Sequence, residues 1–340
     1  MRKPDTLSVL VFIRSWGIVI LLALLWIVFS FWAPEFSGFD NLTQILQAAS
    51  ISAIFAAAIA MGVFSGVLDL SVPGVASLSA VVMAWIMNQG GNLWVGIAAA
   101  LVVGVLLGLF NGVISLRGIN PLAVTIGTLS ITSGVAALIT TGPALFGLDA
   151  LTFLGLDYYF GIPATFWIAA LVFVVGTVFL TQTRGGAHFM AAGGNPEALR
   201  RAGVNANTFK LLGFILSGLL SAVGGVVTSA YTLQADPSPA TATLFTGLTA
   251  VALSGISLAG GRGSLPKVFI GALLIQSIGN VLILKGIEPY VGEVVTGALL
   301  IGALALEFSI NKGVSSQVVK ARNASNSTAT GVLNLVKGKK

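Results

Sequence analysis

Long apolar runs separated by short polar segments dominate this sequence. A helix needs about 20 consecutive apolar residues to cross the hydrocarbon core of a membrane. Segments close to that length lie near residues 16–33, 43–64, 73–88, 93–116, 122–141, 163–182, 211–231, 243–259, 267–284 and 290–310. The pattern predicts an all-α polytopic membrane protein with about ten transmembrane helices, forming one domain over residues 1–312. We expect the polar tail after it, residues 313–340, to be disordered and cytoplasmic.

The composition supports this fold class and excludes several kinds of chemistry. Charged residues make up 8% of the chain and hydrophobic residues 56%, whereas a soluble domain has roughly 25% charged residues. The chain has no cysteine, which excludes disulfides and thiol catalysis, and its single histidine, His188, cannot form a metal site alone. The pattern Gly-x-x-x-x-Gly-Lys-Ser/Thr is also missing, so we expect this chain to bind no ATP itself. The sequence predicts no metal site, no cofactor and no catalytic residues.

Positive charge gathers in alternate connecting segments. Lys and Arg occur in 1–15, 117–121, 183–210 and 260–267, whereas 34–41, 142–162 and 232–242 carry acids only. Positively charged loops stay in the cytoplasm. The alternation therefore predicts a protein of the bacterial cytoplasmic (inner) membrane with both termini on the cytoplasmic side. Lys285, in an expected outer loop, is the exception. The positive residues behind the net charge of +6 thus lie where loops are expected to contact anionic lipid. The charge therefore does not indicate binding to nucleic acid.

One polar segment holds a short helix with both of its ends marked in the sequence. Asn195 is an N-cap residue type, and Pro196 follows at the first helical position, where its missing N–H costs nothing. The helix dipole favours an acid at the start and bases at the end, as in Glu197, Arg200 and Arg201. Gly203 can take the left-handed conformation that ends a helix. A stiff charged helix between membrane spans suggests a part that transmits motion.

Two stretches resemble broken helices. Residues 65–74 put an acid and a proline between apolar runs, and residues 254–264 contain four glycines. Irregular backbone at membrane depth is tolerated only where protein or a water-filled cavity satisfies it, and such breaks often mark a substrate route. The alternative is that both are ordinary tight turns between spans.

Polar residues on or beside the spans are the candidates for a translocation path. Each has a structural alternative: an acid such as Asp69 can cap a helix, asparagines can join helices, and threonines such as Thr125 and Thr128 can bond to their own helix. The candidates are Asp69, Ser71, Asn111, Asn120, Thr125, Ser254, Ser257 and Asn280.

The sequence also contains an internal echo. Asn111 followed by Arg-Gly-Ile-Asn-Pro at 117–121 matches Asn280 followed by Lys-Gly-Ile-Glu-Pro at 285–289. The first turn is expected inside and the second outside, so a true repeat would be inverted. The match is short, and chance is the alternative.

Several motifs, taken together and in order, resemble the permease family of ribose-type ABC importers, within the broader branched-chain amino acid and sugar permeases. They are Asp-Leu-Ser-Val at 69–72, Asn-Gly at 111–112, Asn-Pro-Leu-Ala-Val-Thr-Ile-Gly at 120–127, Gly-Gly-Asn-Pro-Glu-Ala-Leu-Arg-Arg-Ala-Gly at 193–203 and Ser-Leu-Ala-Gly-Gly-Arg-Gly-Ser at 257–264. The likeness spans roughly residues 16–312. Val67, Pro73 and Ala187 depart from the family pattern.

The resemblance implies a transport subunit without catalytic activity of its own. Its partners would be a cytoplasmic ABC ATPase that binds ATP and Mg²⁺, a second permease copy or a homologous permease, and an extracytoplasmic solute-binding protein that delivers a monosaccharide. The family's cytoplasmic coupling loop corresponds to the segment 183–210. The ATPase-coupling residues would then be Gly193, Gly194, Asn195, Pro196, Glu197, Ala198, Arg200, Arg201 and Gly203.

Two other functions stay open from the residues alone. One is a secondary carrier or channel that works without an ATPase. A proton-coupled carrier usually needs a buried carboxylate or histidine relay, and the only carboxylates within or beside spans are Asp69, Glu293 and Glu307. The other is an ABC permease for amino acids or another small polar solute.

Overall fold

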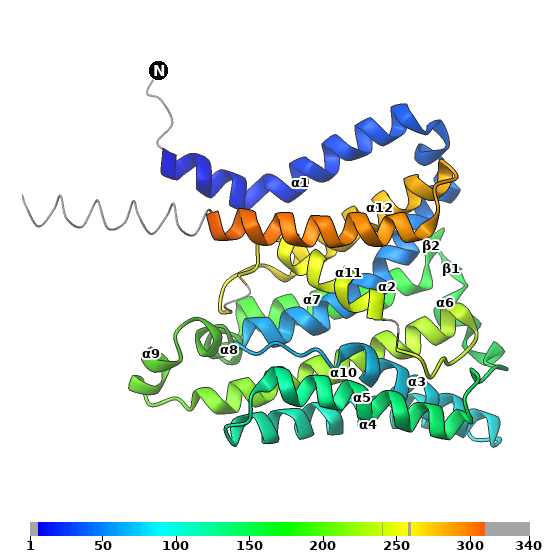
Figure 1. The fold of residues 1–340 in the computed structure, drawn as a ribbon, viewed down its shortest axis with the longest axis horizontal. Helices are drawn as coiled ribbons and strands as arrows, with labels where there is room; N and C mark the ends of the chain where they lie inside the picture. The colour runs from blue at the N-terminus through cyan, green and yellow to red at the C-terminus, as the bar shows by residue number, and fades with distance from the viewer. Residues whose placement is uncertain (1–5, 240, 258–259, 310–340) are drawn as a thin grey trace, which may run out of the picture.

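The computed structural model describes residues 6–239, 241–257 and 260–309, so the tail predicted at 313–340 lies outside the described residues. Most described residues belong to helices, in agreement with the predicted fold class (Figure 1). The long helices are α1 (Thr6–Trp32), α2 (Phe39–Phe64), α3 (Val72–Asn88), α4 (Leu93–Leu116), α5 (Pro121–Thr140), α7 (Ala164–Gln182), α10 (Ala206–Thr232), α11 (Thr241–Leu253), α12 (Leu265–Leu284) and a last helix, Pro289–Ser309. The short elements are η1 (Pro34–Ser37), η2 (Asp149–Leu151), α6 (Thr152–Gly155), β1 (Tyr158–Tyr159), β2 (Ile162–Pro163), α8 (Arg184–Gly194) and α9 (Pro196–Arg201).

Each predicted span coincides with a helix, but the helices differ in length. Within the described part of the chain, seven helices are long and apolar enough to cross a membrane, and the apolar helices Val72–Asn88 and Thr241–Leu253 are shorter. The span predicted at 243–259 is too long, because α11 ends at Leu253. Gly255 follows with φ +74°, a left-handed conformation that stops the helix.

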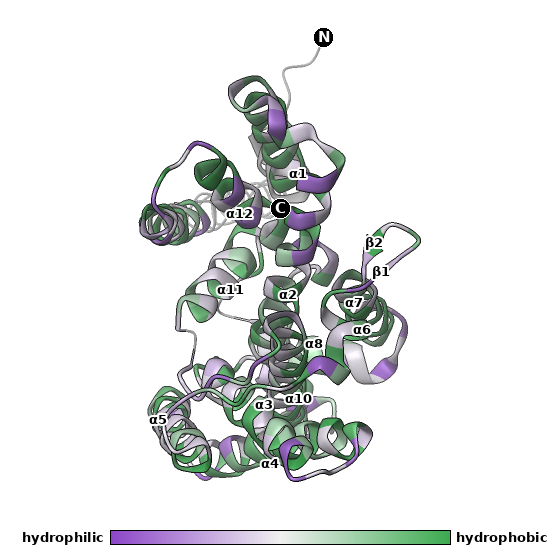
Figure 2. Cartoon of the chain, turned by 90° about the vertical axis from the view of Figure 1, so that its right-hand side faces the viewer, coloured by the Kyte–Doolittle hydropathy of each residue, from purple (hydrophilic) through white to green (hydrophobic). Residues whose placement is uncertain are grey.

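The bundle is built around α2. It packs against α10, α12, α11 and α7, and most of its residues are buried. A view along the helices shows α2 and α10 in the middle, with α4 and α5 on one side and α1 and α12 on the other (Figure 2). Small residues allow close approach: a Cβ placed on Gly218 of α10 would lie 3.0 Å from the Gly108 nitrogen of α4.

The connecting segments gather at two ends of the bundle. At one end, Leu145 and Ala235 exchange backbone hydrogen bonds, and the Gln47 side chain donates to the Gly155 carbonyl (2.8 Å). We call this the hairpin end, after β1 and β2. The positive segments 117–121 and 184–205 lie at the opposite end, the α9 end, where α1 begins and the last helix finishes (Figure 1). The predicted alternation of the loops between two ends is therefore confirmed.

Candidate functional site

The short helix predicted from its caps is α9, Pro196–Arg201. The Asn195 side chain accepts a hydrogen bond from the Ala198 N–H (2.9 Å), and Gly203 has φ +80°. The Val204 N–H donates to Leu199 O and the Gly203 N–H to Arg200 O, which is the Schellman pattern of helix termination. The predicted start and stop of this helix are confirmed.

The charges of α9 face away from the bundle. Glu197 bonds Arg200 (2.9 Å) and Arg201 (3.3 Å), and all three side chains are more than half exposed. On the opposite face, Leu199 is buried with residues of α8 and α10, Ala192 and Ala206. One face of α9 is thus anchored, and the other is free to meet a partner.

The helix before α9 was not anticipated from the sequence. Thr183 caps α8, its side chain accepting a hydrogen bond from the Gly186 N–H (2.9 Å). Since α8 is rich in glycine and alanine, its pattern alone does not separate it from an irregular loop. A hydroxyl residue three positions before Gly186 is the signal that marks its start.

The last residues of α8 contact both predicted breaks. A Cβ on Gly193 would overlap the Phe64 carbonyl at the end of α2, and would lie 2.8 Å from both the Gly66 and the Gly261 nitrogens. Gly261 also donates to the Phe64 carbonyl (3.3 Å). We call the residues Gly66, Gly193, Gly194, Gly260 and Gly261 the glycine junction. Three segments far apart in the sequence meet there, backbone against backbone.

The predicted coupling residues therefore fall into two groups. Gly193 and Gly194 lie inside the glycine junction, whereas Glu197, Arg200 and Arg201 form the exposed face of α9. Motion of the exposed helix would reach the junction through α8. The close approach of the two breaks to α8 is a tertiary fact that no spacing in the sequence reveals.

Asp69, Ser71 and Asn111 lie together in a buried polar chain. The Ser71 N–H and hydroxyl both donate to Asp69 Oδ1 (2.9 and 2.6 Å), and Asn111 Nδ2 donates to the Ser71 hydroxyl (2.9 Å). Thr128 of α5 donates to Asn111 Oδ1 (2.5 Å). This series of hydrogen bonds, which we call the Asp69 chain, joins the first break to α4 and α5. All four residues are at least 98% buried.

The second carboxylate oxygen of Asp69 has a different environment. Among the described residues, Oδ2 has no hydrogen-bond partner, and the same holds for the Ser217 hydroxyl of α10, which lies beside the carboxyl. One half of the carboxylate thus holds Ser71, the residue just before α3, while the other half faces α10. The local role expected of a capping acid accounts for Oδ1 only.

The other candidates for the path lie elsewhere. Asn120 is exposed and caps α5 through the Leu122 N–H (2.9 Å), and Thr125 donates to the Leu122 carbonyl (3.3 Å). Asn280 exchanges amide hydrogen bonds with Asn41 of α2 (2.8 and 3.0 Å). In the second break the Ser254 hydroxyl donates to Val251 O (2.6 Å), and the Ser257 N–H to Arg262 O (3.4 Å). Of the eight candidates, the structure brings only Asp69, Ser71 and Asn111 into one network.

A cavity of about 250 Å³ lies between α2, α3, α10, residues 234–238 and Thr243 of α11. We call it the hydroxyl cavity, because seven of its lining residues are Ser or Thr. Helical spacing could have suggested these residues, since Thr228, Ser229 and Thr232 share one face of α10. The lining residues are Ile51, Ser52, Phe55, Pro73, Ala76, Ser77, Ala80, Gly225, Thr228, Ser229, Thr232, Gln234, Asp236, Ser238 and Thr243.

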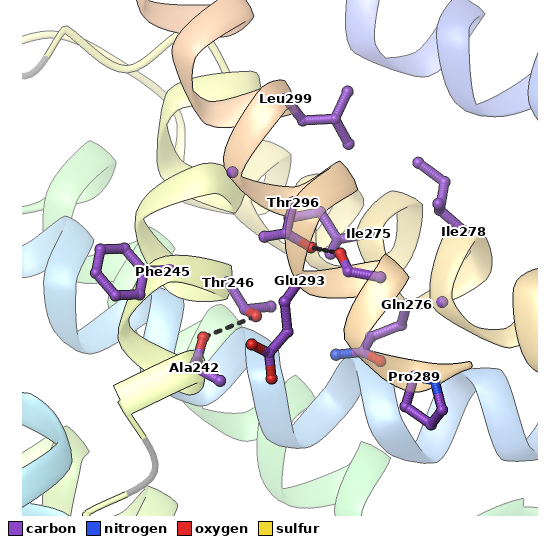
Figure 3. A pocket seen from close by; sticks show the side chains of 13 residues that line it. Ala242, Phe245, Thr246, Ile275, Gln276, Ile278, Pro289, Glu293, Thr296 and Leu299 are labelled. Carbon is purple, nitrogen blue, oxygen red and sulfur yellow. Dashed lines mark hydrogen bonds between the residues drawn. The ribbon is translucent and has the colours of Figure 1, made fainter. Parts of the chain in front are cut away.

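A second cavity, of about 420 Å³, lies between α11, α12 and the last helix. Figure 3 shows the Glu293 carboxylate pointing into it, between Thr246 and Gln276. The Thr246 hydroxyl donates to its own helix at Ala242 O (3.0 Å), and Gln276 donates to the Ser52 hydroxyl of α2 (2.6 Å). Because most of the remaining lining is apolar, this cavity offers fewer free polar groups than the hydroxyl cavity.

These features define a class of protein. Long apolar helices form the bundle, a charged capped helix projects from one end, and its base is joined to two broken segments within the bundle. Among the described residues, no group of three or more His, Asp or Glu side chains is placed to hold a metal ion. The architecture is that of an integral membrane permease.

Comparison with known proteins gives the family. The family model described as "Branched-chain amino acid transport system / permease component" matches residues 41–304, and the chain belongs to this family. The L-arabinose transport system permease protein AraH of Escherichia coli (strain K12) is 34% identical over 296 residues, covering 86% of this chain and 90% of that protein.

Two further relatives and one solved structure resemble the chain. The ribose import permease protein RbsC of the same organism is 32% identical, with 87% of this chain and 95% of that protein covered. The D-allose transport system permease protein AlsC is 30% identical, with 92% and 96% covered. A metal-chelate type ABC transporter in an inward-facing conformation has a TM-score of 0.48 and 16% identity, covering 86% of this chain and 98% of that chain. The relatives named here are transport permeases.

Proposed function

We propose that this chain is the membrane-spanning permease subunit of an ATP-driven importer that carries a monosaccharide across the cytoplasmic membrane. Ten helices cross the membrane in this proposal, and the α9 end, with both termini, faces the cytoplasm. The relatives named for arabinose, ribose and allose support the solute class. The concentration of Arg residues at the α9 end supports the orientation.

The observation that carries the proposal is the link between α9 and the two breaks. An ATPase docked on the exposed face of α9 would displace α8. Since Gly193 contacts Phe64 and Gly261 without an intervening side chain, the displacement would reach α2 and the second break directly. Packed backbone transmits strain because it cannot be compressed.

Three partners follow from this function. A separate ABC ATPase would bind ATP and Mg²⁺ and dock on α9. A second permease subunit, identical or homologous, would complete the pathway. A solute-binding protein would deliver the solute at the hairpin end. A secondary carrier or channel would leave the charged, solvent-exposed surface of α9 without a role. This favours the ATP-driven importer over that alternative.

The test reverses one charge on α9. Glu197→Arg places a positive charge at the positive end of the helix dipole and beside Arg200 and Arg201. We expect solute uptake by the assembled importer to fall about tenfold or more, as a coupling free energy of one to three kcal/mol allows, with normal abundance in the membrane. Uptake and ATPase co-purification are the measurements.

A matched control exists at the other end of the molecule. Asp149 is an exposed acid in the first turn of η2, at the hairpin end, so Asp149→Arg makes the same change away from the ATPase. It should leave ATPase co-purification unchanged. Full uptake and full ATPase binding by the Glu197→Arg importer would refute docking on α9.

A further inference from the structure

The hydroxyl cavity is formed by one face of each of three central helices. Pro73, Ala76, Ser77 and Ala80 lie on a single face of α3, at the helical spacing i, i+3, i+4 and i+7. Faces of α2 and α10 with similar spacing line the other sides, together with residues 234–238 and Thr243 of α11. At about 250 Å³ the volume is slightly below the roughly 300 Å³ at which small-molecule sites begin, so it suits a small solute.

The lining is polar for a chain of this composition. Nine of the fifteen lining residues are polar, although hydrophobic residues make up 56% of the chain. Some of these groups hold the cavity together: the Ser77 hydroxyl donates to Asp236 O (2.6 Å), and Thr232 donates to Gln234 O (3.1 Å). These two bonds fasten residues 234–238 to α3 and α10.

Other polar groups in the lining have no partner within the described part of the chain. Ser229 of α10 is 97% buried and lines the cavity, yet its hydroxyl makes no hydrogen bond to a described residue. A helical serine usually bonds back to the carbonyl four residues earlier, as Ser221 does on the same helix (2.7 Å). The side-chain amide of Gln234 is likewise unpartnered among the described residues. Buried polar groups of this kind are costly unless a ligand or water pairs them.

The charges of the cavity restrict the kind of solute. Asp236 is the one charged lining residue, and no Lys or Arg reaches the cavity from the described segments. A phosphate or an amino-acid carboxylate would therefore enter without a cationic partner. Hydroxyls, an amide and a carboxylate can bond a neutral polyol, and the Phe55 ring with small neighbours such as Ala76 offers an apolar wall for its C–H groups.

We propose that the hydroxyl cavity is a transient binding chamber for a small, neutral, polyhydroxylated solute on its way through the permease, with Ser229 and Gln234 as contact residues. The inference rests on the proposed function and adds the site and its selectivity. Pro73 lines the chamber two residues after Ser71, so the chamber ends where the Asp69 chain and the first break begin. Movement of that break would change the floor of the chamber.

The first test removes the two contact groups. The importer is reconstituted with its ATPase and binding protein, and uptake of D-ribose, L-arabinose and D-allose is measured. The double variant Ser229→Ala, Gln234→Ala should lower uptake of the transported sugar about fivefold or more, the scale of one or two lost hydrogen bonds. The ATPase rate stimulated by the loaded binding protein should not change. Ser221→Ala is the control, because this buried serine lies on the same helix, bonds to its own backbone and is not a lining residue.

The second test does not depend on transport. The chain has no cysteine, so Ser229→Cys places a single thiol in the chamber with little change in size. A small methanethiosulfonate reagent should label it in the assembled importer, and the transported sugar should slow the labelling about fivefold or more, with Ser221→Cys unlabelled.

The outcomes separate the two proposals. Suppose that the wild-type importer takes up a sugar, that the double variant takes it up equally fast, and that the sugar does not slow the labelling of Ser229→Cys. The chamber is then refuted, and the proposed function stands. If the wild-type importer takes up none of the three sugars and takes up an amino acid instead, the proposed solute class is refuted, and with it the neutral-polyol selectivity of the chamber.

Discussion

The α9 end and the hairpin end of this permease differ in how closely their segments pack. At the α9 end, Gly193 and Gly261 bring backbones so close that no side chain fits between them. Toward the hairpin end, α2, α3 and α10 separate enough to enclose the hydroxyl cavity. In the proposed junction, glycines allow backbones to contact each other directly and so to transmit motion. In the proposed binding chamber, side chains from different helices leave a space between them that a solute can fill.

The largest expected effect is at the glycine junction. Gly193→Ala places a Cβ against the Phe64 carbonyl and 2.8 Å from Gly261 N, and backbone cannot move aside as a flexible side chain can. We expect uptake to fall roughly a hundredfold, toward the upper end of the range of allosteric coupling. The measurement is solute uptake per permease molecule in the membrane, together with ATPase co-purification.

The neighbouring glycine is the control. A Cβ on Gly194 would have its closest neighbour, Gly261 Cα, at 3.4 Å, which is ordinary contact, so Gly194→Ala should keep most of the uptake. Equal uptake by the two variants at equal abundance would show that the backbone contacts of Gly193 within the glycine junction are not needed for transport.

The next effect concerns the first break, between the two ends. Asp69→Leu leaves the Ser71 N–H and hydroxyl without their acceptor, at a cost of about 1–3 kcal/mol for each unpaired buried group. If this segment borders the path, we expect a variant that inserts and binds the ATPase but does not transport. Asp69→Asn keeps an acceptor oxygen for Ser71, and so tests whether the charge itself is needed.

Two results would change the interpretation of Asp69. Normal transport by the Leu variant would exclude a role in the path. A Leu variant that fails to accumulate in the membrane, beside an Asn variant with normal transport, would leave Asp69 with the local role of holding Ser71 just before α3.

The smallest effect is expected at the asparagine pair that joins α12 to the start of α2. Asn280→Ala breaks the amide bonds with Asn41, and interhelical hydrogen bonds in membranes are worth about 0.6 kcal/mol on average. A slightly lower thermal midpoint in detergent, with uptake unchanged, is the expected result. Loss of uptake without loss of stability would place Asn280 on the path after all.

The internal echo is another pair of regions whose local structure is similar. Both turns contain a glycine of positive φ, Gly118 at +101° and Gly286 at +69°, and a helix begins at Pro121 in one case and at Pro289 in the other. The preceding asparagines differ completely, since Asn111 is fully buried in the Asp69 chain and Asn280 pairs with Asn41. The local turn follows from its residues, while a repeat of the fold is not established by it.

The sequence by itself determined the features that depend on neighbours along the chain. Apolar length placed the helices, and Asn195, Pro196 and Gly203 set both ends of α9, because caps and dipoles act within one turn. The position of charge predicted which loops share an end. The start of α8 was missed because four of its eleven residues are glycine, which has a low helix propensity.

Only the tertiary structure decided which of these parts meet. Gly66, Gly193 and Gly261 lie far apart in the sequence, and their contact depends on how α2, α8 and the second break pack. The hydroxyl cavity likewise belongs to several helices and a loop at once, so no single segment predicts it. Packing joins distant residues by shape, and shape is a property of the folded bundle that local patterns do not contain.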